Sequence, residues 1–421
     1  MRYPLERLTR ASKQGRKGLL KIAILYSHLK EKGGAENVIL KQTELLNHSH
    51  HEALSYFAYV DKKLERRTSN PHCYVKSYFS RLLPKSKTAR ILLSIPLAPL
   101  ALKSLNEADV LLCHGYGPAP WIGYMLKKLK RKKYVSYIHS PPRFLYLAPE
   151  DRNLWRFDDT RDLIFLLSKL GGQLLRKIDL LGVSNSDKVL VNSQFTARRV
   201  KRIYGVDPVV CYPPVDVKTY RPVPKRMVRK VRAKFGGPLV LSTGRIAAVK
   251  RWEWLVEMMP YITKNFPSAT LAVTGEISTE NVAYVQQLMR LAKLLGVKEN
   301  IKFLGFQQLN DLIALYNAAD AYVYPVPRED FGLGPVEAMA CGTPAVVWND
   351  GAGPCETVTQ GKTGFRAEPY FIEDFAEKTM KAFDIDKENM RDYAFDFVKN
   401  NYSPGKHLET LENALKEVVA Q

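Results

Sequence analysis

The chain has 421 residues, of which 46% are hydrophobic and 25% charged, and 64 lysines and arginines against 42 aspartates and glutamates give a formal net charge of +22. This length favours two domains of roughly 200 residues each, and the balanced composition excludes a disordered or low-complexity chain. The excess of positive charge predicts an anionic partner, for which nucleic acid, an acidic membrane surface and a phosphorylated substrate all qualify.

Residues 1–19 form a basic extension, and the apolar run that follows reads as a first strand. That run contains Lys21 and lacks the small-residue cleavage site of a secretory signal. The most apolar segment, residues 91–102, is shorter than the ~20 residues of a membrane span and contains Pro96 and Pro99. We therefore predict no transmembrane helix and expect a buried helix at 91–102, with an interfacial membrane contact as the alternative.

Short β-rich apolar runs alternate with longer helical patterns, which is typical of parallel α/β domains. The runs that read as strands are 21–27, 53–60, 109–115, 134–140, 188–193, 238–245, 269–276, 300–306, 321–326 and 344–348. A proline- and charge-rich segment follows the fifth run, so we place the domain boundary near 216–220. Residues 20–216 and 217–402 would then form two Rossmann-like, doubly wound domains that face a central cleft and bind ligand at the carboxyl ends of their strands.

Two features of the first half follow predicted strands. Gly33 and Gly34 lead from a strand into a helix, so the backbone can approach a ligand closely and the helix N-terminus offers N–H groups to an anion. A merely tight turn is the alternative. His139 ends another strand and precedes the proline-rich residues 141–143, where an imidazole could hydrogen-bond a polar ligand near neutral pH. A structural or surface histidine is the alternative there.

In the second half, Gly244 and Arg245 end a strand and Lys250 lies near the start of the next helix. Two cations five residues apart on one strand-to-helix loop could clamp a diphosphate. Arg245 would act as a planar fork and Lys250 as a point charge. A solvated basic loop is the alternative.

The segment REDFGLGPVEAMACGTP, residues 328–344, holds two glutamates around a glycine-rich stretch. We expect residues 331–334 to form a flexible turn and Pro335 to lie in the first turn of a helix. Glu337 would also fall in that first turn, where a carboxylate suits the helix dipole. No histidine or aspartate cluster joins Glu329 and Glu337, so no metal site is predicted. A glycosidase-type carboxylate pair stays open on spacing alone.

Two further classes of protein are disfavoured. The cysteines are odd in number, scattered and without C-x-x-C spacing, which argues against a disulfide framework or zinc site and for a reducing compartment. They are Cys73, Cys113, Cys211, Cys341 and Cys355. A basic nucleic-acid-binding protein would explain the charge, but the chain shows no recognised reader motif and no interleaving of aromatic with basic residues.

Together these pieces resemble the retaining nucleotide-sugar glycosyltransferases of family 4, the group 1 glycosyltransferases with the GT-B fold. The resemblance extends over nearly the whole chain from Leu20, because GGAE, the strand-end histidine, VNSQFT, YPPVD, GRIAAVK, EDFGLGPVEAMACGTPAV and GFRAEP occur in the family's order. It implies a metal-independent hexosyltransferase without a cofactor. It also implies a C-terminal helix, residues 403–421, that packs back on the first domain.

The resemblance implies roles for the residues near the nucleotide. Glu337 would hold the ribose. Arg245 and Lys250 would neutralise the diphosphate as it leaves, which makes them catalytic. Gly33 and Gly34 would face the distal phosphate.

It also implies roles near the transferred sugar. Glu329 would grip sugar hydroxyls together with the backbone of Phe331, Gly332 and Leu333, and His139 would contact the sugar near the scissile bond. Glu329 and His139 are therefore also expected to be catalytic. The acceptor hydroxyl would attack from the face of the leaving group, so the linkage would be retained.

The chain departs from the family pattern at Arg251, where glycine is usual, and at Gly334, where proline is frequent. Residues 141–157 resemble loops of some mannosyltransferases in the family, which favours GDP-mannose as the donor. A UDP-sugar is the alternative, since members that use one share the same central motifs.

Three basic runs, 127–133, 198–202 and 225–234, could dock an anionic bilayer at about 1 kcal/mol per residue near the surface. With the basic N-terminus, they favour a cytoplasmic enzyme, peripheral at the cytoplasmic face of a membrane, that acts on a lipid-linked saccharide. A solvated charged face is the alternative.

Overall fold

A computed structural model describes residues 19–29, 33–60, 75–77, 105–146, 151, 154, 163–279 and 281–421. The basic extension up to residue 18 and the apolar segment 91–102 lie outside these residues, so the expectations for them stay predictions. Among the described helices, none combines the length and the apolarity that crossing a bilayer demands.

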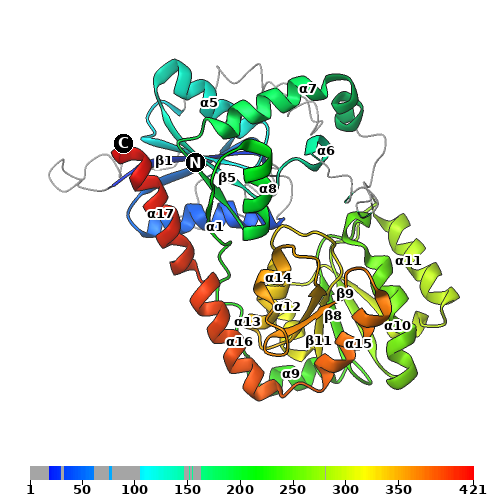
Figure 1. Cartoon of the computed structure of the whole chain (residues 1–421). Coiled ribbons are helices and arrows are strands. Elements are labelled where there is room, and N and C mark those ends of the chain that lie inside the picture. The colour runs from blue at the N-terminus through cyan, green and yellow to red at the C-terminus, as the bar shows by residue number, and fades with distance from the viewer. Residues whose placement is uncertain are drawn as a thin grey trace.

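The first domain is built on a seven-stranded sheet with the strand order β3-β2-β1-β4-β5-β6-β7 (Figure 1). Its strands are β1 (Lys21–Leu29), β2 (Glu52–Val60), β3 (Val75–Ser77), β4 (Val110–His114), β5 (Lys133–Ile138), β6 (Lys188–Val191) and β7 (Val209–Val210). Each pairs with its neighbours in parallel. Every residue of β4 is buried, as expected for the centre of a sheet covered on both faces.

The second domain holds a six-stranded parallel sheet in the order β10-β9-β8-β11-β12-β13. Its strands are β8 (Leu239–Thr243), β9 (Thr270–Thr274), β10 (Ile301–Gly305), β11 (Ala321–Tyr324), β12 (Ala345–Trp348) and β13 (Gly364–Ala367). The predicted fold class, two doubly wound α/β domains, is confirmed. The prediction missed β3 and β7, which have only three and two residues, and β13, whose sequence GFRA is not an apolar run.

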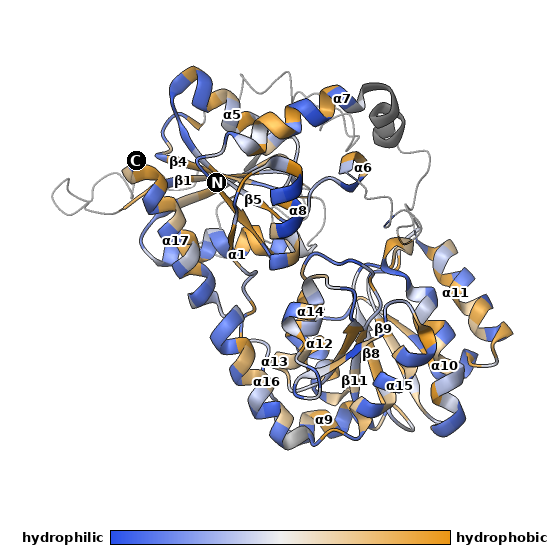
Figure 2. Ribbon diagram, in the orientation of Figure 1, coloured by the Kyte–Doolittle hydropathy of each residue, from blue (hydrophilic) through white to orange (hydrophobic). Residues whose placement is uncertain are grey.

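Helices cover both faces of each sheet, as the alternation of core residues shows. Leu239 and Leu241 of β8 belong to one apolar cluster and Val240 between them belongs to another, because successive side chains point to opposite faces. Figure 2 shows the strands as predominantly apolar and the outward faces of the helices as hydrophilic. The helices are α1 (Gly34–His48), α5 (Pro118–Lys130), α6 (Arg143–Tyr146), α7 (Leu163–Ser184), α8 (Gln194–Tyr204), α9 (Lys225–Arg232), α10 (Trp252–Asn265), α11 (Val282–Leu294), α12 (Leu309–Ala318), α13 (Leu333–Ala340), α14 (Gly353–Thr357), α15 (Ile372–Phe383), α16 (Lys387–Tyr402) and α17 (Pro404–Ala420), with short 3-10 helices η4 (Ala248–Lys250) and η5 (Lys298–Asn300).

The chain crosses between the domains twice. It leaves the first domain after β7 and returns between α16 and α17 (Figure 1). The two crossings lie side by side, because the Val215 N–H donates to the Tyr402 carbonyl at 2.7 Å. Leu411 and Leu415 of α17 join the apolar cluster that contains Ile24 of β1. The first domain therefore consists of two separate stretches of the chain.

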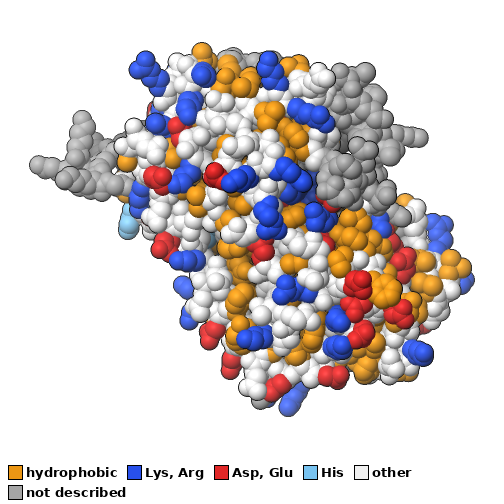
Figure 3. Space-filling view, in the orientation of Figure 1, with side chains coloured by type: hydrophobic (Ala, Val, Ile, Leu, Met, Phe, Trp, Pro, Cys, Tyr) orange, Lys and Arg blue, Asp and Glu red, His pale blue; other side chains and the backbone are white. Residues whose placement is uncertain are grey.

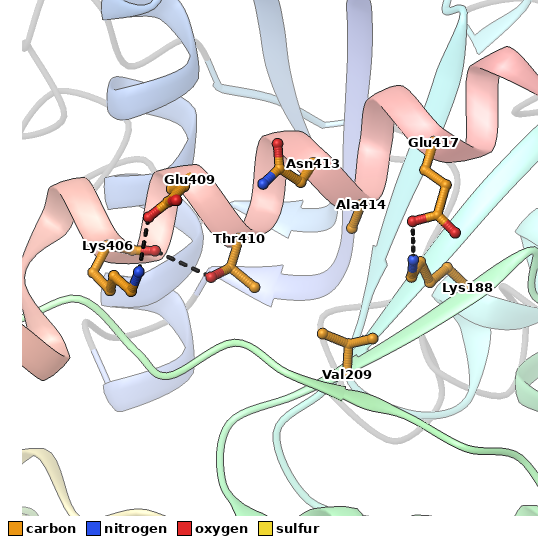
Figure 4. Close-up of a pocket in the computed structure, with 8 residues that line it drawn as sticks. All are labelled: Lys188, Val209, Lys406, Glu409, Thr410, Asn413, Ala414 and Glu417. Atoms are coloured by element: carbon orange, nitrogen blue, oxygen red, sulfur yellow. Dashed lines mark hydrogen bonds and ion pairs between the residues drawn. The ribbon is translucent and has the colours of Figure 1, made fainter.

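A hollow of about 250 Å³ lies between α17 and strands β6 and β7 (Figure 4). Lys188 forms an ion pair with Glu417 across it, and Lys406 pairs with Glu409 within α17 at 2.9 Å. Lys188 is the first residue of β6, so the hollow lies at the amino end of the sheet. The predicted ligand site belongs to the carboxyl ends of the strands, at the opposite edge.

Candidate active site

The carboxyl ends of the two sheets face each other. Gly34 follows β1 and Leu333 opens α13 after β11, and a Cβ atom on Gly34 would lie 3.6 Å from Cδ1 of Leu333. Arg143, which follows β5, donates to Asp330, which follows β11, at 2.5 Å. The glycine-rich turns that the sequence marks in each half are therefore brought together at one interface between the domains.

Lys250, Glu329 and Tyr324 form a hydrogen-bonded group at the ends of η4 and β11. Nζ of Lys250 donates to Oε2 of Glu329 at 2.8 Å and contacts the Tyr324 hydroxyl at 3.0 Å. The Tyr324 hydroxyl donates to the same carboxylate oxygen at 2.8 Å. The side chains of Lys250 and Glu329 are 24% and 18% exposed, so the pair is largely shielded from water but within reach of a ligand.

The carboxylate of Glu329 is held in its ionised form. Burial by itself would raise its pKa, but the charges of Lys250 and Arg143 and the hydrogen bonds from Lys250 and Tyr324 lower the pKa to about 2. Glu329 therefore carries no proton at neutral pH. It can accept hydrogen bonds from hydroxyl groups, but it is a poor general acid.

Glu337 lies in the second turn of α13, and its predicted place in the first turn was wrong. The helix begins at Leu333, two residues before Pro335, so Glu337 is its fifth residue. The Tyr316 hydroxyl donates to Oε2 of Glu337 at 2.8 Å. Burial raises the pKa of Glu337, whereas hydrogen bonds from Tyr316 and Tyr220 lower it. Its environment thus differs from that of Glu329, which is paired with a cation.

The predicted flexible turn at 331–334 was also wrong, because these residues are packed. Phe331 is buried against Tyr212 and Tyr402, with ring centroids 6.0 and 5.7 Å apart. Gly332 takes the left-handed φ of 82° at the N-cap of α13. A Cβ atom on Gly334 would lie 2.1 Å from the Tyr322 hydroxyl, so no larger residue fits there without movement.

The loop that carries Arg245 and Lys250 ends at Arg251, just before α10. Arg245 is exposed, and its carbonyl accepts a hydrogen bond from Nε1 of Trp252 at 3.2 Å. Arg251, which replaces the family's usual glycine, has a left-handed φ of 57° at the N-cap of α10. Its guanidinium lies 4.1 Å from the ring centroid of Trp254. The stacked arginine thus occupies a backbone conformation that favours glycine.

The Gly33–Gly34 turn opens α1, as predicted, with Gly33 at the N-cap. A Cβ atom on Gly33 would lie 2.6 Å from Oε2 of Glu36, so the Glu36 carboxylate packs directly against this glycine. Nε2 of His28 lies 3.9 Å from the other oxygen of Glu36. Glu36 was not among the predicted site residues, although an acidic residue three positions after an N-cap is a recognised signal.

His139 is paired with a second histidine. Nε2 of His139 and Nδ1 of His114 lie 3.0 Å apart, and the two rings are stacked with centroids 5.2 Å apart. Burial lowers the pKa of His139 to about 3, although Asp330 opposes this shift. Its carbonyl accepts from Nδ2 of Asn192 at 2.9 Å. The imidazole is therefore neutral near pH 7.

Asp330 is the residue of the interface that sequence reasoning missed most clearly. It is 5% exposed and accepts hydrogen bonds from Arg143 and from Arg199 of α8. These partners lie 187 and 131 residues away in the chain. No local sequence pattern indicates such contacts, because Asp330 is distinguished in the sequence only by its place next to Glu329.

Many cations of the predicted basic runs are engaged within the protein. Nζ of Lys127 pairs with Asp187 at 2.8 Å, and Lys132 donates to the Ala108 carbonyl at 2.6 Å. Arg199 is buried at the domain interface. Figure 3 nevertheless shows Lys and Arg side chains gathered over α8, so part of the charge stays on the surface.

Within the described part of the chain, no three His, Cys, Asp or Glu residues are grouped so as to hold a metal ion. The four described cysteines are free thiols.

Two family profiles match the chain in succession. Residues 32–219 match Glycosyltransferase Family 4, and residues 225–397 match Glycosyl transferases group 1. The D-inositol 3-phosphate glycosyltransferases of Mycobacterium bovis and Mycobacterium tuberculosis are 35% identical to the chain over 189 residues. That match takes in 43% of this chain and 38% of theirs, so the chain matches well under half the length of these curated relatives.

Solved structures share the fold at low sequence identity. The Anabaena protein Alr3699/HepE in complex with UDP is 21% identical, with a TM-score of 0.75 over 94% of this chain and 100% of that chain. Sucrose-phosphate synthase from Thermosynechococcus elongatus is 17% identical, with a TM-score of 0.77 over 95% and 99% of the two chains. Because the two profiles together take in most of the chain and the architecture agrees with these structures, the chain belongs to the group 1 glycosyltransferases of family 4, with the GT-B fold.

Proposed function

We propose that this protein transfers a hexose from a nucleoside diphosphate sugar to a saccharide acceptor. The observation that carries the proposal is the Lys250–Glu329 pair, 2.8 Å apart, which lies at the carboxyl ends of the second sheet and faces the first domain. The D-inositol 3-phosphate glycosyltransferases and the complexes of Alr3699/HepE with UDP and UDP-glucose support this class of reaction.

In the proposed reaction, Lys250 and Arg245 stabilise the negative charge that develops on the diphosphate as the glycosidic bond breaks. Glu329 accepts hydrogen bonds from hydroxyls of the transferred sugar and keeps Lys250 oriented. Glu337 holds the ribose. These cations supply the charge that a metal ion would otherwise bring, so we propose a metal-independent enzyme without a cofactor.

We further propose that the linkage is retained. The resemblance of the motifs to the retaining glycosyltransferases of family 4 supports this proposal. The departing diphosphate oxygen then accepts the proton of the acceptor hydroxyl, which attacks from the same face. His139 contacts the sugar near the bond that breaks.

The donor is proposed to be GDP-mannose or a UDP-sugar. Resemblance of residues 141–157 to mannosyltransferase loops supports GDP-mannose. The UDP and UDP-glucose bound to Alr3699/HepE support a UDP-sugar.

For the acceptor we propose a lipid-linked saccharide at the cytoplasmic face of an anionic membrane, supported by the net charge of +22. Co-sedimentation with anionic liposomes should weaken as salt rises, because exposed charges are screened within about 10 Å at 0.1 M salt. Binding that persists unchanged at high salt would contradict electrostatic docking.

A donor panel tests the proposed function. Thermal unfolding with GDP, UDP and their sugars should show one nucleotide that raises the melting temperature, since binding to the native state stabilises it. With that donor, the nucleoside diphosphate should be released only when a saccharide acceptor is present. Tight binding of an oligonucleotide with no response to any nucleotide would overturn the proposal.

A further inference from the structure

We infer that Arg143 of the first domain is a positioning residue: it holds the chain on both sides of Glu329 and so completes the orientation of this carboxylate when the two domains are closed. The inference rests on the proposed function, because it assigns a cause to the placement of Glu329. The contacts that carry it belong to residues 328 and 330, which flank Glu329.

One guanidinium bridges the two flanking residues. Nη2 of Arg143 donates to the carbonyl of Arg328 at 3.1 Å and to Oδ2 of Asp330 at 2.5 Å. Glu329 lies between these two attachment points. A planar guanidinium that donates on both sides of a residue restricts the backbone of that residue more than a single contact would.

The carboxylate of Asp330 is also held from a second element of the first domain. Nη1 of Arg199 donates to Oδ1 of Asp330 at 2.7 Å, and Oγ1 of Thr196 donates to the same oxygen at 3.3 Å. Asp330 and Arg199 are 5% and 8% exposed, so their charges are shielded from water when the domains meet. Separation of the domains would return these charges to water and release Asp330.

Arg328 reinforces the grip from the other side. Its Nε donates to Oδ1 of Asp151 of the first domain at 3.1 Å, and its guanidinium lies 5.0 Å from the ring centroid of Phe195. The residue has a left-handed φ of 50°, a conformation that is unfavourable for a non-glycine residue. The Arg328 N–H and Nη1 also donate to Asp350 of the second domain, so contacts with both domains stabilise a local backbone shape that is unfavourable by itself.

The backbone held in this way reaches Glu329 directly. The N–H of Asp330 donates to Oε1 of Glu329 at 3.1 Å, while Lys250 and Tyr324 donate to Oε2. Both carboxylate oxygens are thus fixed, one by the gripped backbone and one by the second domain itself. Domain closure thus completes an orientation of Glu329 that Lys250 and Tyr324 provide in part within the second domain.

The test compares Arg143→Gln and Asp330→Asn, which break the same contact from opposite domains, with Arg232→Gln as the control. Arg232 forms an ion pair with Asp320 inside the second domain, so its loss does not touch the interface. Hydrogen exchange of a peptide spanning 324–334 should be at least threefold faster in both interface variants than in the wild type. The control should exchange at the wild-type rate.

Kinetics with the donor found by the panel supply the second measurement. In both interface variants kcat should fall at least tenfold while KM for the donor changes less than threefold, and Arg143→Lys should recover only part of kcat. Unchanged exchange at 324–334, or an equal loss of kcat in Arg232→Gln, would overturn the inference. If the wild type transfers no sugar, the proposed function fails, and the exchange measurement still decides the inference.

Discussion

Lys250 and Glu329 depend on each other at the scale of single residues. Each is more than three quarters shielded, and each neutralises the other's charge at 2.8 Å. A buried charge that loses its partner is strongly unfavourable. The pair therefore serves the folded structure and the proposed chemistry at the same time, and experiments must separate the two effects.

Lys250→Ala should reduce the rate of transfer by about 100-fold or more, because it removes charge from the site where we propose that the diphosphate leaves. The initial rate of nucleoside diphosphate release measures this change. Lys264→Ala is the matched control, since Lys264 is exposed on the outer end of α10 and should keep the wild-type rate. Wild-type turnover in purified, folded Lys250→Ala would rule out the assigned role.

Glu329→Gln should lower the free energy of unfolding by about 2–3 kcal/mol at pH 7. The folded-state pKa of about 2 lies below the ordinary value of 4.5, so the carboxylate contributes stability above pH 4.5 and loses it as pH falls through 2. The difference in the free energy of unfolding between variant and wild type should therefore decrease by about 1 kcal/mol as the pH falls from 7 to 3.5. Urea unfolding at several pH values measures it, and a constant difference would contradict the depressed pKa.

The sequence predicted the candidate residues that follow strands, since the carboxyl ends of parallel strands gather at one edge. His139, Lys250 and Glu329 were selected as candidates in this way. Their partners were not predicted, because Asp330 and Arg143 are 187 residues apart, and His114 ends β4 whereas His139 follows β5. Charge pairing across the domain interface is a property of the folded arrangement alone.

At the scale of elements, the observed starts of two helices differ from what the local sequence predicts. The helix α13 begins earlier than Pro335 suggests, because Gly332 takes a left-handed conformation that can open the helix at Leu333. The helix α10 begins after Arg251, which takes a left-handed conformation without being glycine. Proline marks a permitted helix start but not a required one.

Arg251 offers a direct test of its backbone strain. Both Arg251→Ala and Arg251→Gly remove the stacking on Trp254, but only glycine also removes the left-handed penalty at φ 57°. The glycine variant should therefore be more stable than the alanine variant by about 1 kcal/mol. Urea unfolding of the two variants compares them, and an alanine variant as stable as the glycine variant would argue against the strained conformation.

Two N-cap serines give a matched pair for helix capping. Oγ of Ser193 accepts from the Thr196 N–H at 2.9 Å at the start of α8, whereas Ser403 at the start of α17 makes no side-chain cap. Ser193→Ala should cost about 1 kcal/mol of stability and Ser403→Ala only a few tenths. Chemical denaturation measures both, and equal losses would contradict the assigned cap.

At the scale of the whole molecule, α17 ties the two domains into one unit. Leu411, Leu415 and Val418 are fully buried in the core of the first domain, although they follow the entire second domain in the chain. Apolar spacing in the last helix predicts a buried face, but not which domain receives it.

Leu415→Ala should destabilise the protein by about 2–5 kcal/mol, because it leaves a cavity beneath α17. Val419→Ala on the same helix is the control, since Val419 is 37% exposed and should change stability by less than about 0.5 kcal/mol. Thermal and urea unfolding measure both variants. Similar losses in the two would show that α17 is not docked as described.

The double crossing of the chain has a consequence for biosynthesis. A ribosome completes β1 to β7 long before it reaches α17, and at about 5–20 residues per second the intervening domain takes on the order of 10–40 s. During that time the part of the sheet that α17 covers, on β4 and β5, lacks this helix. The second domain can therefore fold before the first one is complete. The first domain, although it is translated first, stays accessible to chaperones until α17 leaves the ribosome.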